Sequence, residues 1–351
     1  MPRSETSHYL GNPLLKAAGV EQQFAQEEIK EYIKCSQDPI YFIKNYIQIV
    51  SLDKGLIPFA LWDFQEKVIQ TVHNNRFVIC KFPRQTGKST TMIAYILHYV
   101  LFNDNMNVAV LANKLATARE LLSRLQLAYE HLPKWLQQGV ISWNKGSIEL
   151  ENGSRIIASA TSSSAVRGGS FNMIFLDEFA YVPHEVADEF FSSVYPTISS
   201  GTDTKILMVS TPRGMNLFYK YWRGANKKEG EPGKNTYVPI EVHWSQVPGR
   251  DEKWKRETIA NSSEEQFRTE FECEFLGSVN TLISPAKLKC MTFESPILKR
   301  EEGLKVYKKP EKDRQYFITV DTSRGLGQDY HAFIVVDTTE SPYEVVATFR
   351  N

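Results

Sequence analysis

The chain has 351 residues, and its 41 lysines and arginines are balanced by 41 aspartates and glutamates. A chain of this length can form two or three domains, and its neutral charge means that a nucleic-acid partner would have to bind to a local basic patch. The four cysteines are far apart in the sequence, which favours buried, reduced thiols over a metal site. No apolar run reaches the length of a membrane span, and the polar N-terminus is not a secretory signal. We therefore expect a cytosolic protein with no membrane partner.

The first two thirds of the chain are predicted to alternate between helices and short apolar strands. Apolar residues at helical spacing predict helix over residues 22–49, broken at Asp38-Pro39, and a second helix that starts near Trp62. Further along, the sequence predicts strands at 76–80, 107–112, 173–176 and 205–209, helices at 91–100 and 117–129, and a β-hairpin with an Asn-Gly turn over 147–158. Such alternation predicts an α/β fold, with a parallel sheet covered by helices on both faces.

Residues 81–90 have the sequence KFPRQTGKST and lie between a predicted strand and a predicted helix, which is the context of a P-loop. In a P-loop, backbone N–H groups bind phosphate oxygens, a lysine reaches the terminal phosphates and a hydroxyl binds Mg²⁺. Lys88 and Ser89 are the candidates for the last two roles. The match is incomplete because Phe82 stands where the pattern has its first glycine. The predicted nucleotide-binding residues of the loop are Arg84, Gln85, Thr86, Gly87, Lys88, Ser89 and Thr90.

Two carboxylates follow the apolar strand predicted at 173–176. Asp177 and Glu178 would lie at the carboxyl end of a parallel strand, which is the edge where α/β sheets bind ligands. Asp177 is the candidate for holding Mg²⁺, and Glu178 for polarising the water that attacks a γ-phosphate. A strand that ends in solvated acids is the alternative interpretation. Ser210, Thr211 and Pro212 end the next predicted strand, where they form either a γ-phosphate sensor or a simple turn.

Two arginines could stabilise negative charge in the transition state. Arg84 lies inside the loop, among the predicted phosphate ligands, and is the favoured phosphate contact. Arg167, in a loop rich in serine and glycine, could act on a neighbouring subunit. Upstream, Phe64 and Gln65 could recognise adenine by stacking and by an amide contact, although a plain amphipathic helix explains them equally well.

After residue 215 the regular alternation of predicted strands and helices ends, and longer polar and charged stretches follow. Residues 223–235 are a polar loop rich in glycine and proline, residues 251–276 are a charged helical stretch, and residues 299–315 have the composition of a linker. Strands are then predicted at 316–321, 330–337 and 344–349. Residues 316–351 are too few to close a domain, so we expect an incomplete unit with an unpaired edge at 344–349.

These motifs together resemble the large terminase subunit of tailed bacteriophages. The resemblance is carried by residues 84–89, 165–168, 177–178 and 210–212, and it extends over nearly the whole chain, including Asn12-Pro13-Leu14-Leu15-Lys16, Trp143-Asn144-Lys145-Gly146-Ser147 and Gln266-Phe267-Arg268. It is strongest with the large terminases of contractile-tailed phages, in which a motor and a nuclease are fused. That family commonly lacks the first P-loop glycine and has a basic residue where this chain has Arg84.

The resemblance implies an ATP- and Mg²⁺-dependent motor with a RecA-like (ASCE) P-loop fold, which moves double-stranded DNA into the viral procapsid. It also implies an RNase H-like endonuclease that cuts concatemeric DNA with two metal ions, to which Asp321 and Asp329 would contribute; the remaining ligands would lie beyond this chain. The implied partners are the portal protein, the small terminase subunit and further copies of the chain in a ring, in the host cytoplasm and transiently on the procapsid. The corresponding domains are an N-terminal helical region (1–60), the ATPase core (61–215), ATPase subdomain II (216–298), a linker (299–315) and the start of the nuclease (316–351).

Two other classes of function fit parts of the pattern. A superfamily 2 helicase shares the Asp-Glu and Ser-Thr motifs, but it needs a second RecA-like domain that residues 216–351 do not predict. A nucleotide-binding adaptor without enzymatic activity needs no carboxylate to polarise water, and Glu178 therefore argues against it.

Overall fold

The computed structural model describes residues 7–51, 53–162, 169–199, 201–275, 295–300, 303–322 and 330–350, without the side chains of 194–199. The chain divides into two compact units, Met1–Thr281 and Leu282–Asn351. Within the described residues, none of the helices is both long and apolar enough to cross a membrane.

The N-terminal region begins with helices and ends with a hairpin. After a short 3₁₀ helix, η1 (Tyr9–Gly11), come α1 (Gln26–Gln37) and α2 (Pro39–Tyr46). Asp38 separates the two helices, as predicted: its side chain accepts hydrogen bonds from the backbone N–H groups of Ile40 and Tyr41 and so caps α2. The prediction that residues 1–60 are helical is incomplete, because β1 (Gln48–Ser51) and β2 (Gly55–Pro58) form an antiparallel hairpin.

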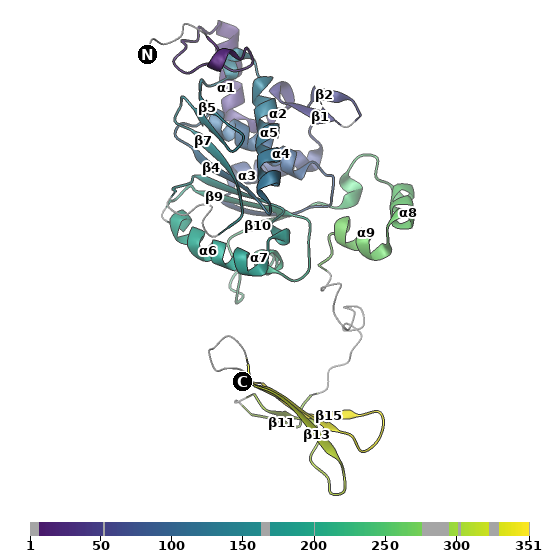
Figure 1. The fold of residues 1–351 in the computed structure, drawn as a ribbon. Coiled ribbons are helices and arrows are strands. Elements are labelled where there is room, and N and C mark those ends of the chain that lie inside the picture. Colours follow the sequence, from purple (N-terminus) through teal and green to yellow (C-terminus); the bar gives the residue numbers. More distant parts are fainter. Residues whose placement is uncertain are drawn as a thin grey trace. The chain divides into compact units, whose positions relative to one another are not determined.

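The first unit is built around an eight-stranded sheet with the order β10-β3-β9-β8-β4-β7-β6-β5 (Figure 1). Its strands are β3 (Phe77–Lys81), β4 (Asn107–Ala112), β5 (Val140–Trp143), β6 (Ser147–Leu150), β7 (Arg155–Ala160), β8 (Met173–Asp177), β9 (Lys205–Ser210) and β10 (Val238–Glu241). The strands from β10 to β7 are parallel, and β6 and β5 extend the sheet in antiparallel fashion. The predicted parallel sheet and the predicted hairpin at 147–158 are thus both present.

Helices cover both faces of this sheet (Figure 1). They are α3 (Asp63–Asn74), α4 (Lys88–Leu101), α5 (Leu115–Glu130), α6 (His184–Ser199) and α7 (Leu217–Ala225). The 3₁₀ helices η2 (Lys134–Leu136) and η3 (Phe179–Tyr181) come between α5 and α6, and η4 (Trp244–Gln246) follows α7 and β10. Successive strand residues point to opposite faces. Val78 accordingly packs in the core beneath α3, α4 and α5, whereas Ile79 packs in the core beneath α6 and α7.

The sheet extends beyond the predicted ATPase core of residues 61–215. Strand β10, which the sequence analysis did not predict, pairs in parallel with β3. It contains Pro239, which has no N–H group to donate and is therefore tolerated at the edge of a sheet. The charged stretch predicted at 251–276 forms two helices, α8 (Glu252–Asn261) and α9 (Glu264–Glu270), because Ser263 caps a new helix.

The described strands of the second unit form an antiparallel sheet with the order β11-β12-β15-β14-β13. They are β11 (Leu298–Lys299), β12 (Lys305–Val306), β13 (Tyr316–Asp321), β14 (Ala332–Asp337) and β15 (Glu344–Arg350). The three strands predicted after residue 315 are therefore present.

The predicted unpaired edge at 344–349 is wrong. Strand β12, from within the predicted linker at 299–315, pairs with β15, so β15 has neighbours on both sides. Among the described strands, the edges of this sheet are instead β11 and β13, and in β13 Phe317 and Ile318 are 62% and 56% exposed.

Candidate nucleotide-binding site

The loop between β3 and α4 has the geometry that a P-loop needs. Gly87 immediately precedes α4 and has φ 69°, a left-handed backbone conformation that glycine adopts without steric cost. A Cβ atom at this position would come within 2.7 Å of the Gln65 Nε2 atom. The backbone conformation therefore favours glycine, and a side chain here would also displace the Gln65 amide. The helix start that follows directs its N–H groups to the carboxyl edge of the sheet, where an anion can bind.

Phe82, which occupies the place of the usual first glycine, belongs to the core. Its side chain is 2% exposed and lies 6.4 Å from the ring of Phe64. Its backbone N–H donates to the carbonyl oxygen of Ser210, which holds the start of the loop against the end of β9. A large apolar residue is therefore accommodated here because it faces the interior rather than the loop.

Phe64 and Gln65, proposed as adenine contacts, are buried at 7% and 3% exposure. The Gln65 amide makes two hydrogen bonds within the protein: its oxygen accepts from the N–H of Trp62, and its nitrogen donates to the carbonyl oxygen of Thr86 at 3.1 Å. Gln65 thus connects the start of α3 to the P-loop. In this arrangement it supports the loop and does not present its amide to solvent.

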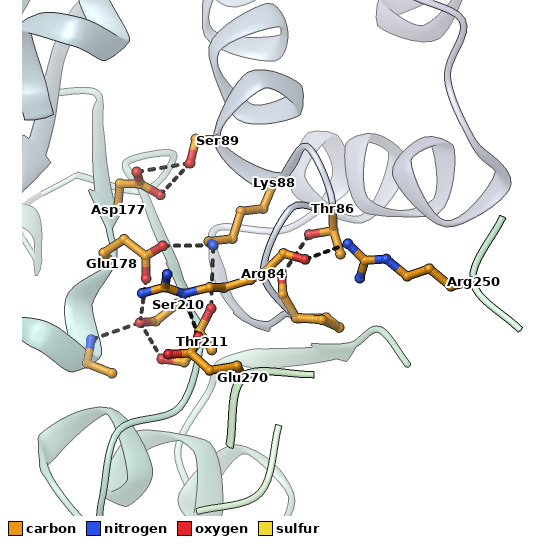
Figure 2. A network of polar contacts seen from close by, with 12 residues as sticks. Arg84, Thr86, Lys88, Ser89, Asp177, Glu178, Ser210, Thr211, Arg250 and Glu270 are labelled. Atoms are coloured by element: carbon orange, nitrogen blue, oxygen red, sulfur yellow. Dashed lines mark hydrogen bonds and ion pairs between the residues drawn. The ribbon is translucent and has the colours of Figure 1, made fainter. Parts of the chain in front are cut away.

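Lys88 and Glu178 form an ion pair at the centre of the site (Figure 2). The Lys88 Nζ atom lies 2.7 Å from a carboxylate oxygen of Glu178 and 3.4 Å from the Thr211 hydroxyl oxygen. Glu178 has φ 50°, which is unusual for a residue with a side chain. Such strained positions are found disproportionately at functional sites. The three side chains come from the starts or ends of α4, β8 and β9, as the sequence predicts.

Ser89 and Asp177 form a second pair beside the first (Figure 2). The Ser89 hydroxyl oxygen lies 3.0 Å from each oxygen of the Asp177 carboxylate, which is 3% exposed. Burial, together with the nearby Glu178 carboxylate, raises the pKa of Asp177 to about 6 against the opposing effects of Lys88 and the Ser89 hydroxyl. A hydroxyl and a carboxylate are the oxygen ligands that Mg²⁺ prefers, so this pair fits the predicted magnesium site.

The raised pKa of Asp177 leads to a prediction about stability. An acid whose pKa is raised by folding destabilises the folded state as the pH rises through the folded-state value. Asp177→Asn is therefore expected to stabilise the nucleotide-free protein at pH 7.5 by at most about 3 kcal/mol, and the gain should shrink towards zero as the pH is lowered to 4. Thermal unfolding of both proteins across this range tests it. Equal stability at pH 7.5 would contradict a raised pKa.

Ser210 ends β9, Thr211 and Pro212 follow it, and all three are buried. The Ser210 hydroxyl accepts a hydrogen bond from the N–H of Ala180 and lies 3.4 Å from a carboxylate oxygen of Glu178. The end of β9 thus contacts both members of the Lys88–Glu178 pair, where a sensor of the terminal phosphate would lie.

Arg84 forms an ion pair with Glu270 of α9 (Figure 2). Its Nε atom lies 2.5 Å from a carboxylate oxygen of Glu270, and its backbone N–H donates to the carbonyl oxygen of Glu270. Arg250, just before α8, donates to the carbonyl oxygens of Arg84 and Gln85. Neither Glu270 nor Arg250 was predicted, because both lie more than 160 residues from the loop that they contact and no short motif marks them.

Of the other predicted site residues, Thr90 lies in the first turn of α4. Arg167 and Asp329 lie outside the described residues. Asp321 is exposed at the end of β13, as predicted. In the parts of the chain that the structure describes, no group of three or more histidine, cysteine or acidic side chains is arranged to hold a metal ion.

A parallel sheet with a Gly-Lys-Ser loop after one strand and an Asp-Glu pair after another defines a P-loop NTPase fold. The comparison with protein families is more specific. The family described as "Terminase large subunit, T4likevirus-type, N-terminal" matches residues 79–289, and the chain belongs to this family.

Similar proteins agree with this assignment. The large terminase subunit of Thermus phage G20c is 32% identical over 183 residues, which are 49% of this chain and 35% of that protein. The large terminase subunit of Escherichia phage T5 is 29% identical over 203 residues, which are 57% of this chain and 44% of that protein. The alignments thus span less than half of the length of these relatives.

Solved structures with the same fold are also large terminases. The large terminase of bacteriophage HK97 has a TM-score of 0.59 at 16% identity, with 89% of this chain and 67% of that chain covered. A mutant of the ATPase domain of the Thermus phage P74-26 large terminase has a TM-score of 0.51 at 20% identity, covering 62% of this chain and 95% of that domain.

Proposed function

We propose that this chain is the ATP-hydrolysing part of a viral DNA-packaging motor. The observation that carries the proposal is the convergence of Lys88, Ser89, Asp177 and Glu178 at one edge of the sheet. A phosphate site, a pair of magnesium ligands and a carboxylate able to polarise water are the parts that ATP hydrolysis needs. Membership of the terminase family gives this chemistry its biological context.

Each side chain of the site has a separate role in the proposed hydrolysis. The N–H groups at the start of α4 and the Lys88 ammonium bind the phosphates, and Lys88 exchanges its partner Glu178 for the terminal phosphate. Glu178, released from that ion pair, orients the attacking water and accepts its proton. Ser89 and Asp177 would hold Mg²⁺, which neutralises phosphate charge when bound. Ser210 and Thr211 lie where they can respond to the presence or absence of the terminal phosphate.

The substrate moved by the motor is proposed to be double-stranded viral DNA, with the portal protein and the small terminase subunit as partners. A ring of copies on the portal would allow Arg167 of one subunit to act on the next, while Arg84 acts within its own site. The protein would work in the host cytoplasm and transiently on the procapsid. Asp321 and Asp329 are proposed to be metal ligands of an endonuclease unit, incomplete in this chain, that cuts concatemeric DNA.

The proposal is tested by measuring ATP hydrolysis with and without double-stranded DNA and a portal protein. The expected result is magnesium-dependent hydrolysis that rises when DNA is added. The absence of hydrolysis under all these conditions would contradict the proposal. A strand-separation assay in the same reactions addresses the helicase alternative, for which unwinding of duplex DNA is required. The described strands of the second unit argue against that alternative, because they form an antiparallel sheet and not a second parallel one.

A further inference from the structure

The guanidinium group of Arg250 contacts the P-loop from outside the sheet. Its Nη2 atom donates to the carbonyl oxygen of Arg84 at 2.9 Å and to that of Gln85 at 3.1 Å (Figure 2). These two carbonyls belong to consecutive peptide units of the loop. Gln85 itself has φ 56°, so the loop adopts a conformation here that a side chain makes unfavourable.

Aromatic rings hold Arg250 in this position. Its guanidinium carbon lies 4.7 Å from the ring centre of Trp254 in α8 and 5.4 Å from that of Phe271, immediately after α9. A planar guanidinium stacks on such rings and still donates in its own plane, which lysine cannot do. The Nη1 atom is buried and has no hydrogen-bond partner among the described residues. Burying the unpaired Nη1 donor lowers the stability of the folded protein. The presence of an arginine at position 250 is therefore not explained by a gain in stability alone.

The two hydrogen bonds also determine where the loop's N–H groups point. In a trans peptide, the C=O and the following N–H are fixed in one plane and point in opposite directions. When Arg250 holds the carbonyls of Arg84 and Gln85, the N–H groups of Gln85 and Thr86 are therefore turned away from it. Neither N–H group donates a hydrogen bond within the part of the chain that the structure describes. Both are available for a phosphate, which is the ligand that such N–H groups bind in a P-loop.

We propose that Arg250 is a positioning residue for nucleotide binding: from the start of α8 it orients the P-loop peptides whose N–H groups receive the phosphates. This inference rests on the proposed function, because it assumes a nucleotide at the P-loop. Its consequence is that the α8–α9 segment and nucleotide occupancy are linked. Phosphate binding to the N–H groups strengthens the opposite carbonyls as acceptors for Arg250.

The test compares ADP and ATP affinity, KM and kcat of the parent with those of Arg250→Met and Arg250→Lys. The methionine variant keeps an apolar stem between the rings and loses the donors. It is expected to bind ADP and ATP about 10-fold to 100-fold more weakly, the effect of losing charged hydrogen bonds, with a larger change in KM than in kcat. The lysine variant keeps the charge and should recover part of the affinity. Arg256→Met is the matched control, because Arg256 is exposed on α8.

Each outcome separates the inference from the proposed function. If Arg250→Met binds ADP within twofold of the parent, the inference is wrong even though the parent binds nucleotide. If both variants lower the melting temperature and kcat while affinity is unchanged, Arg250 has a merely structural role and the inference is also wrong. If the parent and Lys88→Ala bind ADP and ATP equally weakly, the proposed function itself fails.

Discussion

Replacing Lys88 by alanine is expected to abolish ATP hydrolysis, with a loss of at least about 100-fold. Lys88 lies 2.7 Å from Glu178, the proposed catalytic carboxylate, and its side chain is 9% exposed. Without it, the charge of the terminal phosphates is uncompensated, and Glu178 repels them in a partly buried site. Steady-state hydrolysis at saturating ATP is the measurement.

The matched control for this variant is Lys67→Ala, which removes an exposed lysine from α3. It should leave hydrolysis unchanged. Activity of Lys88→Ala within about tenfold of the parent would contradict the assignment of residues 81–90 as a P-loop. Loss of activity in both variants would point to damage that is unrelated to the site.

Glu178→Gln is expected to separate nucleotide binding from hydrolysis. Glutamine has nearly the same shape but cannot accept a proton from water, so kcat should fall by about 100-fold or more. Binding should be retained or become tighter, because in the parent the carboxylate competes with the phosphate for Lys88. ATP affinity and kcat measured on the same preparation test both parts.

Glu185→Gln is the control for this second variant, since Glu185 is exposed near the start of α6. If Glu178→Gln loses nucleotide binding together with turnover, then Glu178 has a structural role. The interpretation of Lys88 as the phosphate-binding ammonium and of Glu178 as the catalytic base is then wrong. Hydrolysis near the parent level would assign the base to another residue.

Local sequence patterns predicted the centre of the first unit well. Strand β4 has the predicted bounds, Asn107–Ala112, because the apolar residues 108–112 form an uninterrupted run that is buried on both faces of a parallel sheet. Asp177 and Glu178 were placed correctly because the carboxyl ends of parallel strands share one edge. Lys88 and Ser89 followed from the spacing of the loop itself.

Contacts between distant segments could not be predicted in this way. Strand β10 is four residues long and contains proline, so its pattern does not differ from that of a loop until β3 is known to lie beside it. The sequence does not distinguish a base-binding role for the Gln65 amide from a plain amphipathic helix, since its acceptor, the Thr86 carbonyl, becomes its neighbour only through folding. The pairing of β12 with β15 could not be predicted for the same reason: it joins distant segments through only two residue pairs.

The strand order also determines when the nucleotide site can form during protein synthesis. Strand β3 lies between β9 and β10, so both neighbours of the P-loop strand are made more than 120 residues after it. The loop is completed by a hydrogen bond from Arg84 to Glu270, which emerges later still. Contacts across such sequence separations fold slowly, because the intervening chain must be ordered before it is stabilised. On the ribosome, β3 therefore stays unpaired until β9 (Lys205–Ser210) and then β10 (Val238–Glu241) have emerged, and the loop lacks its contact with Glu270 for longer still. During that interval the apolar strand exposes the nascent chain to aggregation.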